Sequence, residues 1–173
     1  MNLHPLFPFL ENRESLVPIL AQAVEQSAST VVVTDLNGTI QYVNPKFVQL
    51  TGYTAAEVIG KNPRILQSGK TPPAVYRDMW AAITKGQEWR GELQNKKKSG
   101  ELYWGSLTIS PIRTRDNVLA YYLGIEEDIT QQKVLELKLQ SSIAELKPRR
   151  PPKTGHAWPP QNRPYEGRVK TDR

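Results

Sequence analysis

The stretch from Asn44 to Asn62, NPKFVQLTGYTAAEVIGKN, contains two short helical patterns, each marked at both ends. Pro45 stands at the first turn of the first pattern, and Gly52 ends it with a residue that accepts a positive φ. Thr54 begins the second pattern, a glutamate follows at the capping-box spacing, and a glycine ends it. The stretch therefore predicts two short helices instead of one long helix.

Strand patterns lie on both sides of these helices. Residues 29–44 form two β-branched runs joined by Asn37 and Gly38, a pair that accepts the positive φ of a tight hairpin turn. Residues 71–86 predict the longest internal helix, with Thr71 as its N-cap. Three strand patterns follow, in residues 88–98, 101–113 and 118–130. The order predicts an α+β fold, in which a five-stranded antiparallel sheet carries short helices on one face.

Helical patterns flank this domain. The segment 11–28 has apolar residues at helical spacing, and Pro18 predicts a late start or a kink. The helix predicted for 131–146 has an apolar stripe formed by Val134, Leu135, Leu137, Leu139, Ile143 and Leu146. We divide the chain into a lead-in and helical cap (1–28), the main domain (29–130), a C-terminal helix (131–146) and a basic, proline-rich tail (147–173).

Composition limits the functions to be considered. The chain of 173 residues has no cysteine and 2 histidines, which argues against a thiolate or histidine metal site and fits a cytoplasmic protein. Residues 1–146 hold 15 basic and 15 acidic side chains, while the tail holds 8 and 2 and so carries the whole net charge of +6. The main domain therefore lacks the basic surface expected for nucleic-acid binding, and no apolar run is long enough to span a membrane. The tail is expected to be disordered, and it is either a binder of an acidic partner or a non-native extension.

The motifs together resemble a PAS domain over roughly residues 28–130. The resemblance rests on the order of the elements, on the stretch Asn44–Asn62, on WRGEL after the long helix and on DIT before the last helix. Such a resemblance implies the PAS fold, with its sheet, its short helices and its flanking helices.

Two further stretches resemble the flavin-binding branch of that family. They are GKNPRILQSGKTPPAVYRDMW (60–80) and LQNKKKSGELYWGSLTISPI (93–112), and the NifL-type redox sensors, which carry FAD, are more similar than the LOV photoreceptors. LOV domains have a reactive cysteine where this chain has Pro63, so a flavin here would form no thiol adduct. They have a phosphate-binding arginine where this chain has Trp80, whose flat face suits an adenine. The resemblance therefore implies FAD, with FMN as the alternative.

The same resemblance assigns the cofactor-binding residues. Asn62, Arg64 and Gln67 match the loop that holds ribityl and phosphate groups. Asn95 matches an asparagine that bonds the edge of the flavin ring, and Gly105 replaces the second one. Glu126 replaces the glutamine that senses the flavin state, and unlike glutamine it can exchange a proton.

Strand alternation supplies the apolar part of the expected site. Leu107 and Ile109 share one side of their strand with Gly105. Gly105 and Gly124 are expected to let a ring lie close to the backbone. Burial of Glu126 is expected to raise its pKa.

We expect a sensory module of a signalling protein and not an enzyme, because no nucleotide-binding glycine motif or acid–base pair is found. The signal is expected to be redox state or oxygen, with blue light as a further option through photoreduction. We also expect a homodimer formed through the flanking helices. The signal is expected to pass to an output domain or a partner protein. The alternative is a flavin-free PAS module that dimerises or binds another small ligand.

Overall fold

The fold is given by a computed structural model, which describes residues 13–146; the tail assigned to 147–173 lies outside the described residues. Its elements are α1 (Arg13–Glu25), β1 (Thr30–Thr34), β2 (Ile40–Val43), α2 (Pro45–Thr51), α3 (Ala55–Val58), the 3-10 helix η2 (Pro63–Leu66), α4 (Pro73–Ile83), β3 (Trp89–Lys96), β4 (Leu102–Arg113), β5 (Leu119–Asp128) and α5 (Thr130–Leu146). No helix in this described part is long and apolar enough to cross a membrane.

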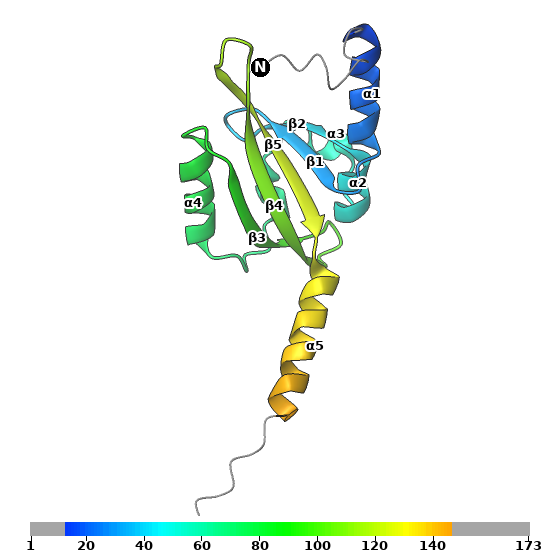
Figure 1. Ribbon diagram of the computed structural model, residues 1–173, viewed down its shortest axis with the longest axis vertical. Coiled ribbons are helices and arrows are strands. Elements are labelled where there is room, and N and C mark those ends of the chain that lie inside the picture. Colours follow the sequence, from blue (N-terminus) through cyan, green and yellow to red (C-terminus); the bar gives the residue numbers. More distant parts are fainter. Residues whose placement is uncertain (1–12, 147–173) are drawn as a thin grey trace, which may run out of the picture.

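The five strands form the predicted antiparallel sheet (Figure 1). Their order in the sheet is β2-β1-β5-β4-β3. The first and last strands of the sequence, β1 and β5, are neighbours in its centre. Helices α2, η2 and α4 bury Phe47, Leu66 and Met79 on the same side as the inward residues of the strands. Helix α5 extends away from the sheet (Figure 1). The α+β prediction is therefore confirmed.

The helix ends follow the sequence signals. Asn44 caps α2 with its side chain, which accepts from the backbone N–H of Phe47, and Gly52 ends the helix at φ 75°. Thr54 and Glu57 form the predicted reciprocal capping box at α3. These local interactions hold the short helices in place without long helical patterns.

Two local predictions are wrong, and one of the two effects predicted for Pro18 is excluded. Thr71 does not cap α4, because Pro72 occupies that position without a side-chain bond. The β1–β2 connection is not a two-residue turn: Gly38 has a positive φ of 78° but Asn37 does not, and Asp35 accepts from the backbone inside the connection. Helix α1 begins at Arg13 and includes Pro18, so the proline does not delay its start.

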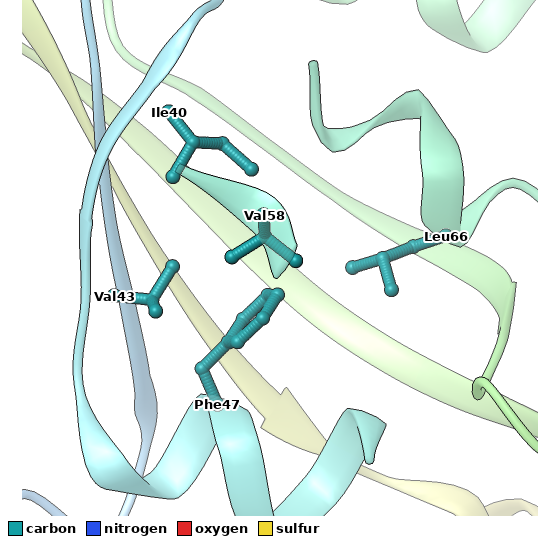
Figure 2. Close-up of a cluster of buried hydrophobic side chains, with 5 residues drawn as sticks. All are labelled: Ile40, Val43, Phe47, Val58 and Leu66. Atoms are coloured by element: carbon teal, nitrogen blue, oxygen red, sulfur yellow. The ribbon is translucent and has the colours of Figure 1, made fainter. Parts of the chain in front are cut away.

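Two apolar clusters form the core. The first joins β2, α2, α3 and η2 through Ile40, Val43, Phe47, Val58 and Leu66 (Figure 2). The second joins α4 to β3 and β5 through Met79, Ile83, Trp89, Leu93 and Tyr122. Together they stabilise the helical layer on both halves of the sheet.

The buried side chain of Asn44 connects α1, β1 and α2. Its Oδ1 accepts from the backbone N–H of Val31 at 2.9 Å and of Phe47 at 3.1 Å. Its Nδ2 donates to the carbonyls of Val24 at 3.1 Å and Ser29 at 3.0 Å. All its hydrogen-bonding capacity is thus used inside the protein, where water cannot replace it.

Replacing Asn44 with alanine should lower the free energy of unfolding by about 3 kcal/mol, because buried backbone groups lose their partners. Chemical denaturation followed by circular dichroism measures this change. Asn37→Ala, at an exposed position whose side chain has no bond within the described residues, should change stability by less than about 0.5 kcal/mol. Equal effects of the two substitutions would contradict the assigned role of Asn44.

Candidate functional site

A cavity of about 150 Å³ lies between the inner face of the sheet and the helical layer. It is roughly ten times the space that one buried water requires. All eight residues assigned to the site from the sequence line it: Asn62, Arg64, Gln67, Trp80, Asn95, Leu107, Ile109 and Glu126. The structure therefore brings together residues from η2, α4 and three strands around one interior space.

The pleat of the sheet explains why the strand residues face this cavity. Leu93 and Asn95 alternate with outward residues on β3, and Tyr122 and Glu126 do so on β5; all four are buried. Leu107 of β4 lies opposite Glu126 in the register. The sheet wall is thus mostly apolar, with Asn95 and Glu126 as polar groups at one end, and the predicted inward orientation is confirmed.

Glu126 is 6% exposed and is held by two neighbours. Asn95 Nδ2 donates to its Oε1 at 2.7 Å, and the Tyr103 hydroxyl donates to its Oε2 at 3.2 Å. Burial raises the pKa of Glu126 to about 7, although these two hydrogen bonds act in the opposite direction. Burial likewise raises the pKa of Tyr103, with the charge of Glu126 as a further cause. The cavity therefore contains a carboxyl group whose protonation can change near neutral pH.

The two inward glycines have different roles. A Cβ on Gly105 would lie 1.8 Å from Glu126 Oε1. This glycine therefore makes room for the carboxyl group, and the prediction that it makes room for a ring is wrong. A Cβ on Gly124 would meet no atom closer than 3.7 Å. Gly124 therefore lines the cavity at a place where an added methyl group would make only ordinary van der Waals contacts, with Leu107 and Val32.

Polar residues and one aromatic surround another part of the cavity. Asn62 caps η2, with its Oδ1 accepting from the backbone N–H of Arg64 at 3.0 Å and from its Nε at 3.3 Å. Arg64 and Gln67 are exposed, so we call this part the mouth. Trp80 meets Tyr122 edge-on with ring centroids 6.4 Å apart. It thus contacts the core cluster while it also lines the cavity.

Sequence reasoning missed the contribution of the β1–β2 connection. A Cβ on Gly38 would lie 2.8 Å from Asn62 Nδ2 and 3.1 Å from the Trp80 ring, so the connection lies directly against these two residues. It also missed Thr30 and Thr34 on β1, and Tyr76 on α4, which line the cavity. Gly38 could have been suspected from its turn position, but Tyr76 carries no sequence signal. Within residues 13–146, no cluster of three or more acidic or histidine side chains could hold a metal ion.

The family model described as a PAS domain matches residues 28–131. The chain belongs to the PAS domain family. Its sequence is 36% identical over 120 residues to a nitrogen fixation regulatory protein of Klebsiella oxytoca, covering 69% of this chain and 24% of that protein. It is 37% identical over 121 residues to a blue-light-activated histidine kinase of Rhizobium johnstonii, covering 68% of this chain and 35% of the kinase. The chain thus spans about a quarter to a third of these relatives.

Solved structures agree with this membership. An RNA-binding light-oxygen-voltage receptor superposes with a TM-score of 0.71 at 28% identity, covering 79% of this chain and 39% of that one. The LOV domain of an Erythrobacter litoralis blue-light activated histidine kinase gives a TM-score of 0.57 at 30% identity, covering 61% and 99%. This chain is therefore a PAS sensory domain related to regulators of nitrogen fixation and to blue-light sensors.

Replacing Glu126 with glutamine should remove a pH dependence of stability. The raised pKa of Glu126 means that the folded state holds a proton that the unfolded state releases between pH 4.5 and about 7. The stabilising contribution is complete below this window and is lost as the pH rises through it, by up to about 3 kcal/mol. Denaturation curves between pH 4 and 8 should show this fall in the native protein and a flatter profile in Glu126→Gln.

Glu127→Gln is the matched control, because Glu127 is exposed on the neighbouring position. Its profile should follow that of the native protein. The prediction is contradicted if the free energy of unfolding of the native protein does not fall between pH 4.5 and about 7 relative to that of Glu126→Gln. The carboxyl group would then have the same pKa in the folded and unfolded states.

Proposed function

We propose that this PAS domain binds a flavin and acts as the sensory part of a signalling protein. One observation carries the proposal: the cavity combines an apolar wall on the sheet, a polar end at Asn95 and Glu126, and a polar mouth at Arg64 and Gln67. A flat heterocycle with one polar edge and a charged tail requires this combination. The chain's similarity to a nitrogen fixation regulatory protein and to blue-light-activated kinases supports the proposal.

The residues present fit such a group. Gly124 leaves cavity space next to the backbone of β5, where a flat ring can approach. Leu93, Leu107 and Ile109 line the apolar wall. Asn95 and Glu126 would hold the polar edge of the ring, and Arg64 would meet phosphate at the mouth.

We assign FAD as the cofactor, with FMN as the alternative. Trp80 lies close to Gly38 and offers an aromatic surface beside the cavity. An adenine stacks well on such a surface, whereas a terminal phosphate does not. This favours the larger cofactor.

The proposed signal is redox state or oxygen. A bound flavin would supply reversible electron transfer coupled to proton uptake. Glu126 would hold or release a proton next to the flavin. Its Oε1 accepts a hydrogen bond from Asn95. Blue light is a further input, by photoreduction, because the chain has no cysteine to form an adduct.

Contacts at the end of β5 connect this carboxyl group to α5. The Glu126 carboxyl group lies over Gly105. The preceding residue, Trp104, is attached to the beginning of α5. The Trp104 N–H donates to Thr130 Oγ1 at 2.9 Å, and its carbonyl accepts from the N–H of Ile129 at 2.8 Å. A shift of the carboxyl would therefore press on β4 directly beside the helix attachment. We infer that this is how the site transmits its state to α5.

The first turn of α5 has a second attachment to the sheet. Lys133 Nζ lies 5.7 Å from the centroid of the Trp104 ring and 2.6 Å from Glu92 Oε2 of β3. Because both contacts are on the surface, each contributes little to stability. Such weak contacts suit a helix that must respond to the sheet.

Reduction of the loaded protein should change backbone hydrogen exchange in the first turn of α5. The native protein should show a several-fold change in exchange rate at Lys133 when dithionite is added, because the Trp104 contacts shift. Glu126→Gln should abolish the change, and Glu127→Gln should retain it. A Glu126→Gln variant that responds like the native protein would exclude the proton relay.

The flanking helices are the proposed surfaces for assembly. Val17 and Leu20 lie on one face of α1, and Leu135 and Leu139 lie on one face of α5; all four side chains are more than half exposed. Apolar stripes of this kind favour pairing of two copies, so we propose a homodimer that passes the signal to an output domain or a partner protein. A monomer at micromolar concentration in sedimentation equilibrium would rule it out. We propose a non-enzymatic, cytoplasmic role without nucleic-acid binding for this domain itself.

The purified protein should be yellow, and heat should release FAD that mass spectrometry identifies. Gly124→Ala should remove the flavin by filling cavity space, yet change the free energy of unfolding of the flavin-free protein by less than about 0.5 kcal/mol, because no atom lies closer than 3.7 Å. Thr108→Ala, on the outward face of β4, should keep the flavin. A colourless native protein that binds no added FAD would favour the alternative, a flavin-free module for dimerisation or for another small ligand.

A further inference from the structure

Tyr76 of α4 has a buried hydroxyl group without a hydrogen-bond partner. Among the side chains that the structure describes, the Tyr76 hydroxyl is the one fully buried polar atom that has no hydrogen-bond partner. Three other buried polar side chains near the cavity have partners: Asn95 and Tyr103 donate to the Glu126 carboxyl group, and Thr30 donates to the Glu126 carbonyl. A buried hydroxyl without a partner destabilises the folded state, because its hydrogen bonds to water are lost on folding and no hydrogen bond within the protein replaces them.

The position of Tyr76 connects this hydroxyl to the cavity. Tyr76 lines the cavity and lies one helical turn before Trp80, on the same face of α4. Its oxygen is buried from bulk solvent and has no partner among the described protein groups. A rotation of the side chain toward the cavity would bring the hydroxyl to a bound molecule.

We propose that the Tyr76 hydroxyl binds the cofactor, by a hydrogen bond to a hydroxyl group of the chain that joins the flavin ring to its phosphate. This inference rests on the proposed function. The sheet already offers Asn95 and Glu126 for the polar edge of the ring, and the mouth offers Arg64 for phosphate. Tyr76 is on the helical side, one turn from Trp80 near the mouth, where the polyol chain would pass. A phenol group can both donate to and accept from such hydroxyls.

Binding of three probes to flavin-free full-length protein tests the assignment. Fluorescence titration with FAD, riboflavin and lumiflavin compares native protein, Tyr76→Phe and Tyr121→Phe; Tyr121 is exposed on the outward face of β5 and is the matched control. Tyr76→Phe should weaken FAD and riboflavin about three- to tenfold, the usual effect of one hydrogen bond. Lumiflavin, which lacks the polyol chain, should bind equally to all three proteins.

Thermal unfolding of the flavin-free proteins gives an independent readout. Because the hydroxyl has no partner within the protein, Tyr76→Phe should keep or raise the melting temperature while it weakens binding. A fall in melting temperature beyond that of Tyr121→Phe would show that the hydroxyl has a structural partner and would overturn the proposal. Unchanged FAD and riboflavin affinity, or an equal loss for lumiflavin, would also overturn it.

These outcomes are distinct from failure of the proposed function. If the native protein binds none of the three flavins, flavin sensing is wrong and this inference falls with it. If the native protein binds FAD and riboflavin and Tyr76→Phe binds them equally well, only the role of Tyr76 is wrong.

Discussion

The pairing of β1 with β5 joins two groups of strands whose other pairings are all between strands adjacent in sequence. Thr30 and Glu126 are 96 residues apart in sequence, yet the Thr30 hydroxyl donates to the Glu126 carbonyl at 3.2 Å in the centre of the sheet. This contact places the β1–β2 hairpin beside the β3–β4–β5 meander and so makes one sheet from two units. The cavity depends on it, because its sheet wall uses residues from both. Asn44 then ties the end of α1 and the start of α2 to the same strand.

The chemical character of the site follows from placing a carboxyl group in that wall. Ionised Glu126 would be costly in an apolar interior, and only Asn95 and Tyr103 offset the loss of water. The balance raises the pKa of Glu126 to about 7, where a small change in its surroundings changes its charge. A glutamine at this position would make similar contacts without this sensitivity. The difference of one atom thus separates a side chain that only forms hydrogen bonds from one that can also exchange a proton.

Local rules predicted the elements well, because their signals are local. The Thr54–Glu57 capping box and the turn at Gly52 involve residues within a few positions of each other. Strand alternation also placed Leu107 and Ile109 on the same side of β4, where both line the cavity. One error concerns a contact across the chain. Thr71 has the sequence context of a helix cap, but its hydroxyl accepts from the backbone N–H of Gln94 in β3 at 2.9 Å.

The site shows the same division. Resemblance to the family and strand alternation together collected eight lining residues. This reasoning did not reveal that Gly105 makes room for the Glu126 carboxyl group, since that depends on a diagonal contact between two strands. Nor did it indicate the unpaired hydroxyl of Tyr76, which depends on how α4 packs. Such features follow from three-dimensional packing, and no spacing in the sequence encodes them.

The attachment of the η2–α4 segment to β3 has a consequence for solubility. Ser68 and Thr71 both bond the backbone of Gln94, and Gln67 forms a bridge with Asn95. This segment therefore covers part of the outer hydrogen-bonding groups of an edge strand, which would otherwise be a template for strand addition by another molecule. The opposite edge strand, β2, has only 4 residues. An open sheet of this kind is protected from edge-to-edge aggregation at both borders, by a covering loop on one and by short length on the other.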